Sequence, residues 1–118
     1  MPETLRQFKA TIFQALAHPT RIAILEILRD QELPVSVIVE RLGLEPSNVS
    51  QHFAIMRSKH LVVNRKEGNQ VYYAIRDPLI NELLDTMRRY FQVHVEESMK
   101  MLQDAESADV ASMAGAAS

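Results

Sequence analysis

Apolar positions recur every three or four residues along the first 42 positions, which is the spacing of amphipathic helices. Pro19 and Pro34 interrupt this pattern. Proline favours the first turn of a new helix, because its missing N–H has no partner there in any case. The pattern predicts helices over residues 3–17, 19–30 and 35–42, with Gly43 ending the third in a left-handed conformation.

A fourth helix and a change of period follow. The fourth helix is predicted to begin at position 46 or 47 and to run to position 59, with an inward face of Val49, Phe53 and Met56. Residues 62–65 and 70–75 are then rich in β-branched and aromatic side chains and flank a turn at 67–69. This part of the sequence predicts a β-hairpin.

A last helix is predicted to begin at Pro78, capped by Asp77, and its apolar stripe continues to Leu102. Residues 105–118 show no periodicity and are predicted to be an unstructured tail after a single domain over residues 1–104. The stripe is too long for so small a domain to cover, and a large exposed apolar patch is unusual in a monomer. We therefore expect a homodimer whose interface includes Leu5, Phe8, Ile12, Ile80, Leu84, Met87, Phe91 and Val95.

Composition narrows the functional classes. The 118 residues contain no cysteine, which excludes disulfides and thiolate metal sites. No apolar run reaches the roughly 18 residues of a membrane span, and the first residues do not resemble a signal peptide, so a cytoplasmic protein is expected. Charge is uneven: residues 1–40 carry four basic and five acidic groups (−1), residues 41–76 six and two (+4), and residues 77–118 three and eight (−5). A basic middle segment is typical of DNA-binding regions.

The helices over 35–42 and 46–59, joined by a short turn that contains Gly43, predict a helix-turn-helix. Away from its inward face, the second of these helices presents Ser47, Asn48, Ser50, Gln51 and His52. Asparagine and glutamine can pair with the major-groove edge of adenine, and serine can pair with several bases. Arg57 and Lys59 lie further along and suit phosphates. By itself, such a polar face is equally typical of a solvated helix.

The predicted hairpin favours DNA binding over an ordinary solvated helix. Arg65, Lys66, Asn69 and Gln70 surround its predicted tip. A basic hairpin directly after a helix-turn-helix is a wing, which can contact the DNA backbone or the minor groove. We therefore expect a mainly α, winged helix-turn-helix fold with about five helices that binds double-stranded operator DNA. Arg65 and Lys66 are expected to contact phosphates.

The sequence resembles the ArsR/SmtB-like family of bacterial winged-helix regulators over about residues 5–92. The matching segments are residues 15–22 (ALAHPTRI), 42–44 (LGL), 47–53 (SNVSQHF), 61–62 (LV), Gly68 and residues 71–73 (VYY). The resemblance implies a homodimer that represses a promoter and releases DNA when an effector, often a metal, binds.

The chain departs from both familiar metal sites of that family. Pro34 and Ser36 stand where the family has two cysteines. At the family's other site, Asp77 matches one ligand, whereas the other positions hold Leu79, Tyr90 and Val93. Because a tight site needs three or four suitable ligands, we expect no metal or other cofactor at either place.

Three alternatives remain open from the sequence alone. His94 and Glu97, three residues apart on the last helix, allow a non-standard metal site shared across a dimer. A winged helix can also be a protein-interaction module that does not bind DNA. An enzyme has little support, because the chain has no cysteine nucleophile, no glycine-rich phosphate loop and no persuasive acid–base pair. The effector, if there is one, is not identified.

Overall fold

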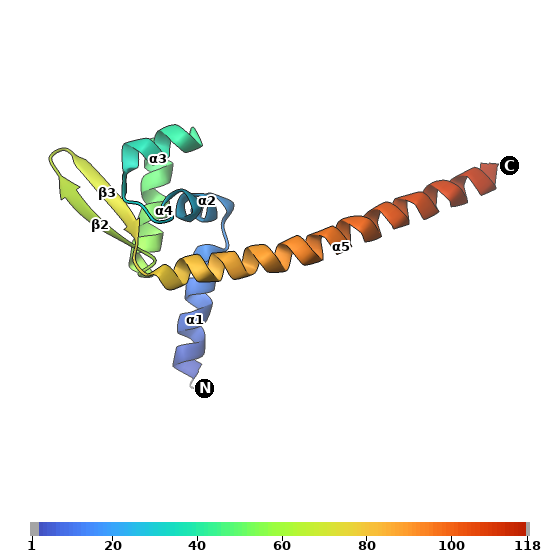
Figure 1. The fold of residues 1–118 in the computed structure, drawn as a ribbon, viewed down its shortest axis with the longest axis horizontal. Helices are drawn as coiled ribbons and strands as arrows, with labels where there is room; N and C mark the ends of the chain where they lie inside the picture. The colour runs from blue at the N-terminus through green and yellow to red at the C-terminus, as the bar shows by residue number, and fades with distance from the viewer. Residues whose placement is uncertain (1–2, 118) are drawn as a thin grey trace. The chain divides into compact units, whose positions relative to one another are not determined.

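Helices and a small sheet follow one another in the order that the hydrophobic spacing predicts, apart from one additional short strand. The structure, a computed structural model, describes the backbone of residues 3–117 and the side chains of residues 3–110. Within these limits it has the five helices and the hairpin of a winged helix-turn-helix (Figure 1). In chain order the elements are α1 (Glu3–Leu16), α2 (Pro19–Ile27), β1 (Leu33–Pro34), α3 (Val35–Leu42), α4 (Pro46–Ser58), β2 (Val62–Glu67), β3 (Gln70–Ile75) and α5 (Pro78–Ala117).

The chain divides inside α5 into two compact units, Met1–Asn81 and Glu82–Ser118. The single domain over residues 1–104 stays a prediction. The second unit consists of the remainder of one helix, and none of its described side chains is buried. Apolar spacing alone cannot distinguish a stripe packed within the chain from a stripe left at the surface.

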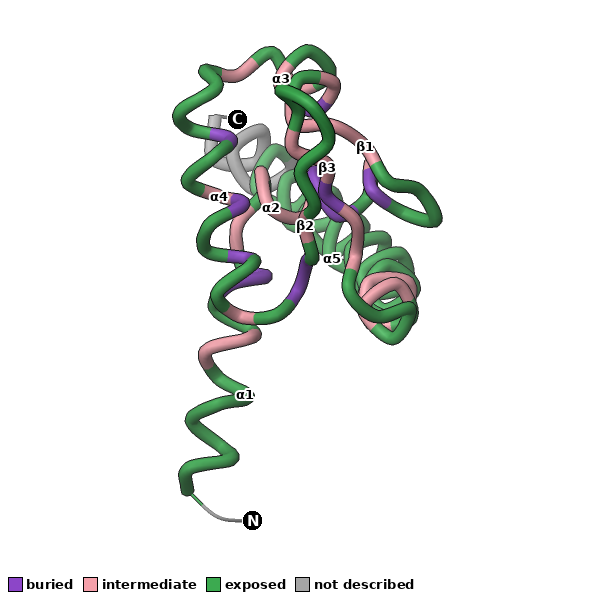
Figure 2. Tube along the Cα trace, turned by 90° about the vertical axis from the view of Figure 1, so that its left-hand side faces the viewer, coloured by how far each residue is buried: buried purple, intermediate pink, exposed green. Residues whose placement is uncertain are grey.

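The hydrophobic core of the first unit lies between α2, α4 and the sheet, with contributions from the end of α1 and from α3 (Figure 2). It contains the inward face predicted for α4. No polar or charged residue of the described part is buried. The buried residues are Ala15, Leu16, Ile24, Leu25, Leu28, Ile38, Val49, Phe53, Met56, Leu61, Val62 and Tyr73.

Capping contacts confirm three predicted helix ends, the start of α2, the end of α3 and the start of α5, whereas α2 ends at Ile27 and not at residue 30. The His18 ring nitrogen Nδ1 accepts a hydrogen bond from the backbone N–H of Thr20 at 3.1 Å, which caps α2. Gly43 ends α3 with φ +65°, a left-handed conformation that favours glycine. Asp77 Oδ1 accepts from the backbone N–H of Leu79 at 2.9 Å and caps α5.

The sheet has three antiparallel strands in the order β1-β3-β2, and β1 was not predicted. Leu33 pairs with Tyr73, and Pro34 pairs with Tyr72. Two residues are too few to show an alternating pattern, and proline is tolerated because β1 is an edge strand. A two-residue turn joins β2 to β3, and Gly68 at its first position has φ +60°, as hairpin turns of this length require.

Helix α5 includes residues 105–117, which the sequence analysis assigned to an unstructured tail, while residue 118 lies outside the described residues. This segment is rich in alanine, which has the highest helix propensity, and it contains no proline. The segment has no regular apolar stripe, so its spacing does not predict a helix, but its composition, apart from Gly115, is compatible with one.

Candidate nucleic-acid interface

The α4 helix buries three large apolar residues on one face and exposes most of its polar residues, together with Ile55, on the other sides. Val49, Phe53 and Met56 are fully buried. Phe53 stacks on Tyr73 of β3, with ring centroids 3.9 Å apart and an angle of 19° between the planes. With 3.6 residues per turn, this contact directs the opposite face outwards. That face carries the predicted residues Ser47, Asn48, Ser50 and Gln51, all of them exposed.

His52 is less accessible than these four residues, and its predicted contact with DNA stays a prediction. It is partly buried against α2, where its ring lies 4.5 Å from that of His18, centroid to centroid. Its Nδ1 lies 3.4 Å from Nη1 of Arg21. Burial lowers the pKa of the His52 imidazole, and the charges of His18 and Arg21 lower it further. The neutral imidazole, with Nδ1 accepting from Arg21, is the form that suits this environment.

The basic residues near the end of α4 are accessible to different degrees. Arg57 is exposed, whereas Lys59 is half-buried. Close by, His60 has φ +60°, and its Nδ1 lies 2.9 Å from Nη1 of Arg76. Arg76 was not proposed from the sequence, because nothing in the pattern indicates a contact between positions 16 residues apart.

The wing residues Arg65 and Lys66 point to opposite faces of the sheet. Lys66 pairs with Val71, which is two residues from the buried Tyr73 and so shares its face. Arg65 pairs with Tyr72 on the other face. The sequence predicts a phosphate contact for both residues, but strand alternation gives their side chains different surroundings.

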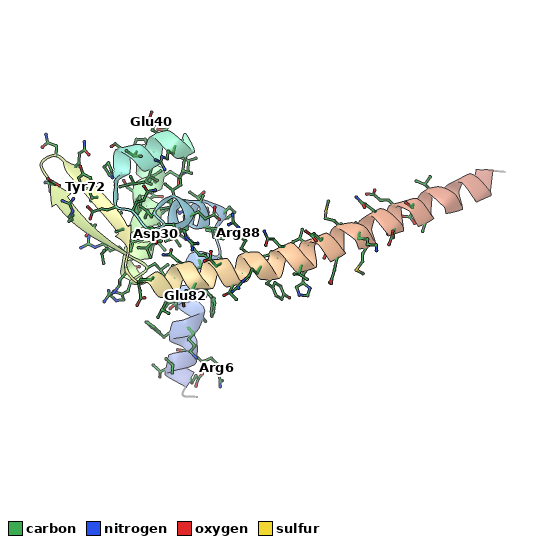
Figure 3. The ribbon with its side chains drawn as sticks, in the orientation of Figure 1. Arg6, Asp30, Glu40, Tyr72, Glu82 and Arg88 are labelled. Atoms are coloured by element: carbon green, nitrogen blue, oxygen red, sulfur yellow. The ribbon has the colours of Figure 1, made fainter. Side chains whose placement is uncertain are left out.

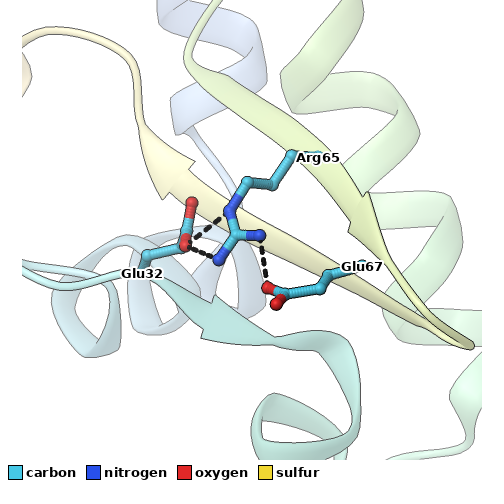
Figure 4. A network of polar contacts seen from close by, with 3 residues as sticks. All are labelled: Glu32, Arg65 and Glu67. Atoms are coloured by element: carbon cyan, nitrogen blue, oxygen red, sulfur yellow. Dashed lines mark hydrogen bonds and ion pairs between the residues drawn. The ribbon is translucent and has the colours of Figure 1, made fainter.

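Arg65 is occupied by two carboxylates (Figure 4). Its Nε and Nη2 donate to Glu32 Oε1 at 2.8 and 2.6 Å, and its Nη1 donates to Glu67 Oε2 at 2.5 Å. The guanidinium carbon also lies 4.6 Å from the centroid of the Tyr72 ring, in a cation–π contact. These hydrogen bonds lower the pKa of Glu32 and raise that of Arg65. Lys66 remains exposed.

A cleft of about 260 Å³ lies between the helix-turn-helix and the wing. The start of α3, Ser50 of α4 and the first residues of β3 contribute to its walls. Asn69 and Gln70 are exposed at the hairpin tip beside it, so the structure brings these two predicted residues close to the predicted reading helix. The cleft is lined by Pro34, Val35, Ser36, Ser50, Asn69, Gln70 and Val71.

The donor chemistry at the two metal positions of the ArsR/SmtB-like family does not fit a metal. Pro34 is the N-cap of α3 and offers no side-chain ligand, and Ser36 is a hydroxyl. Asp77 Oδ1 is engaged in capping α5. His94 Nδ1 lies 3.5 Å from Glu97 Oε2, but the described residues contain no group of three or more His, Cys, Asp or Glu arranged to hold a metal ion. In the described part of the chain, no helix is long and apolar enough to span a membrane.

A tri-helical core with a helix-turn-helix followed by a wing defines the winged helix-turn-helix class, and comparisons with known proteins agree. A sequence model of the bacterial regulatory proteins of the arsR family matches residues 18–63. The HTH-type transcriptional regulator Rv0081 of Mycobacterium tuberculosis is 37% identical over 103 residues, which span 86% of this chain and 90% of that protein. The chain therefore belongs to the arsR family and is a winged-helix transcriptional regulator.

Solved structures show the same fold. The crystal structure of M. tuberculosis Rv0081 matches with a TM-score of 0.76 and 36% identity, covering 83% of this chain and 99% of that one. The solution structure of the homodimeric winged helix-turn-helix DNA-binding domain Mb0332 from Mycobacterium bovis matches with a TM-score of 0.72 and 27% identity, covering 77% of this chain and 84% of that one.

Proposed function

We propose that this regulator is a homodimeric repressor that binds double-stranded operator DNA with α4 in the major groove. The observation that carries the proposal is the outward face of α4. Its exposed hydroxyl and amide groups can form hydrogen bonds with base edges, while the opposite face is anchored in the core by Phe53. The outward-facing side chains are Ser47, Asn48, Ser50 and Gln51.

The wing supplies contacts that do not depend on sequence. Lys66, Asn69 and Gln70 are exposed near the hairpin tip, and the last two line the cleft that also contains Ser50. A phosphate strand that follows the groove beside α4 would pass this tip. Lys66 would then contribute a phosphate contact, with Arg57 contributing another from the end of α4.

The dimer is supported by apolar surface that this chain leaves uncovered on each unit. On α1, Leu5 and Phe8 are 43% and 51% exposed, and on α5 Phe91 and Val95 are 51% and 47% exposed. A second copy would cover these side chains and remove them from water. The homodimeric state of the Mb0332 domain supports a dimer. Met87 belongs to the same proposed surface, as do the half-buried Ile12, Ile80 and Leu84.

Regulation by the family's familiar metal sites is not part of the proposal. Pro34 and Leu79 cannot bind a metal through their side chains, and without coordination energy a metal cannot shift the balance between the DNA-binding and released states. Titrating zinc, nickel, copper(I) and arsenite into the protein–DNA complex should leave its affinity unchanged. A tight, stoichiometric metal that lowers affinity at least about tenfold would instead direct attention to His94 and Glu97.

The proposal is tested by selecting bound fragments from a library of double-stranded DNA and measuring the affinity of variants for the enriched site. Gln51→Ala should lower affinity for that site by about 1–3 kcal/mol and relax the preference for one base pair. Ser58→Ala is the matched control on the same helix, because its hydroxyl already donates to the Ile55 carbonyl at 2.7 Å. Failure to enrich any sequence would favour a protein-interaction module over a DNA reader.

A further inference from the structure

The side chain of Arg65, on β2, contacts both Tyr72 on β3 and Glu32 next to the start of β1. Arg65 on β2 pairs with Tyr72 on β3, and Tyr72 pairs with Pro34 on β1. The side chain lies over the Tyr72 ring and reaches Glu32, the residue immediately before β1, with two N–H groups (Figure 4). Glu67 lies two residues along the same strand and holds the third nitrogen.

The strand that follows Glu32, β1, can form few backbone hydrogen bonds with β3. It is two residues long, and one of them, Pro34, has no N–H to donate to β3. The same proline is the N-cap of α3, so no loop separates the strand from the helix-turn-helix. Any movement of β1 relative to the hairpin therefore moves the start of α3 relative to the wing.

We propose that Glu32 and Arg65 form a positioning pair that fixes the wing relative to the helix-turn-helix, and that Arg65 is not a phosphate contact. The proposal rests on the proposed DNA-binding function. Its consequence is geometric: the pair holds the edges of the cleft between Ser36 on α3 and Asn69 on the wing at a constant spacing. The residues of α4 and of the wing that line the cleft can then contact DNA at the same time, without losing further conformational entropy on binding.

The net charge of Arg65, Glu32 and Glu67 together supports a positioning role for Arg65. One guanidinium faces two carboxylates, so the three side chains carry a net charge of −1, which does not attract a phosphate. Glu32 is bound by two nitrogens of the planar guanidinium, and the Tyr72 ring supports that plane from β3. Lys66, which points to the opposite face, has no carboxylate partner of this kind among the described contacts and is the better phosphate ligand.

The decisive experiment measures the affinity of the full chain for its selected DNA site over a range of salt concentrations. Glu32→Gln and Arg65→Ala should each weaken binding by about two- to fivefold, the range expected for an exposed ion pair, and the double variant should be no weaker than either one. None of the three should change the slope of affinity against salt. Glu40→Gln, an exposed acidic residue on α3 (Figure 3), is the control for loss of one negative charge.

Direct contact between Arg65 and phosphate gives the opposite pattern. In that case Arg65→Ala lowers the salt slope by about 0.9, Arg65→Lys preserves both slope and affinity, and Glu32→Gln strengthens binding by freeing the guanidinium. Any of these three results overturns the proposal, as does a Glu32→Gln variant that behaves like Glu40→Gln. If the wild-type chain selects no DNA at all, the proposed function fails, whereas the positioning pair remains testable in the free protein.

That second test uses the absence of cysteine from the chain. Spin labels on cysteines introduced at Glu40 of α3 and Asn69 of the wing report the distance between the two elements without DNA. The distance distribution should be narrow in the labelled parent and should broaden equally with Glu32→Gln and with Arg65→Ala. An unchanged distribution in both variants shows that the backbone alone fixes the wing, and the proposal is then wrong.

Discussion

Replacing Phe53 with alanine should weaken the packing of α4, the helix proposed to read DNA, against the wing. Phe53 is fully buried on the inner face of α4, and its ring stacks on Tyr73 of β3. Alanine removes the ring from a site that neighbouring side chains can only partly refill. The substitution therefore removes both apolar burial and the aromatic contact that joins α4 to the sheet.

The expected cost is about 3–5 kcal/mol, the range for truncating a buried phenylalanine. Since a domain of this size is stable by only about 5–15 kcal/mol, a large part of its stability would be lost. Chemical denaturation, followed by circular dichroism at a fixed protein concentration, measures the change. The melting temperature should fall by roughly 12–20 °C, at about 4 °C per kcal/mol.

Ile55→Ala is the matched control, because Ile55 lies on the same helix but is 41% exposed. It should cost about 1 kcal/mol or less. If Phe53→Ala costs no more than Ile55→Ala, the inward face of α4 has been assigned incorrectly. The outward face would then be wrong as well, because the helical period links the two, and the proposed base contacts of Gln51 would lose their support.

Three further outcomes are expected. Lys66→Ala should weaken binding to all DNA sequences alike and reduce the salt slope by about 0.9, and a change confined to one sequence would contradict its assignment to phosphate. Phe91→Asp places a charge on the proposed dimer surface and should yield monomers or unfolded chains in sedimentation experiments; a folded dimer of wild-type affinity would refute that surface. The pKa of His52 is lowered in the folded chain, so the unfolded state binds its proton first as pH falls. Stability to denaturant should therefore decrease as the pH falls through about 6.5, the ordinary histidine pKa at which the unfolded chain takes up the proton, and His52→Gln should lessen that decrease.

Most of the secondary structure could be predicted because it depends on neighbours in sequence. The boundaries of α3 follow from Pro34 and Gly43, and the start of α5 follows from Asp77 and Pro78. The inward face of α4 follows from a period of 3.6 applied to Val49, Phe53 and Met56. β1 could not be predicted, since its two residues form a strand only because β3 lies beside them.

The candidate site also contains residues whose surroundings follow from local spacing and residues whose surroundings depend on tertiary contacts. The exposure of Ser50 and Gln51 follows from the period of α4 once its apolar face is known. The surroundings of His52 are ambiguous in sequence, because it lies between these two faces; the structure places its ring beside that of His18, the N-cap of α2. A contact between residues 34 positions apart cannot be read from the spacing of α4, and the predicted contact of His52 with DNA stays a prediction.

The sequence by itself determined the order of the helices and the hairpin, the caps at Gly43 and Asp77, the basic middle segment and the polar face of α4, because each depends on residue type and local spacing. Only the tertiary structure could decide the surroundings of Arg65. Its partner Glu32 is 33 residues away, and the two meet because β3 brings β1 and β2 to the same level. By residue type alone, a basic side chain can bind either a phosphate or a carboxylate of its own chain. The folded chain determines which of them lies within reach.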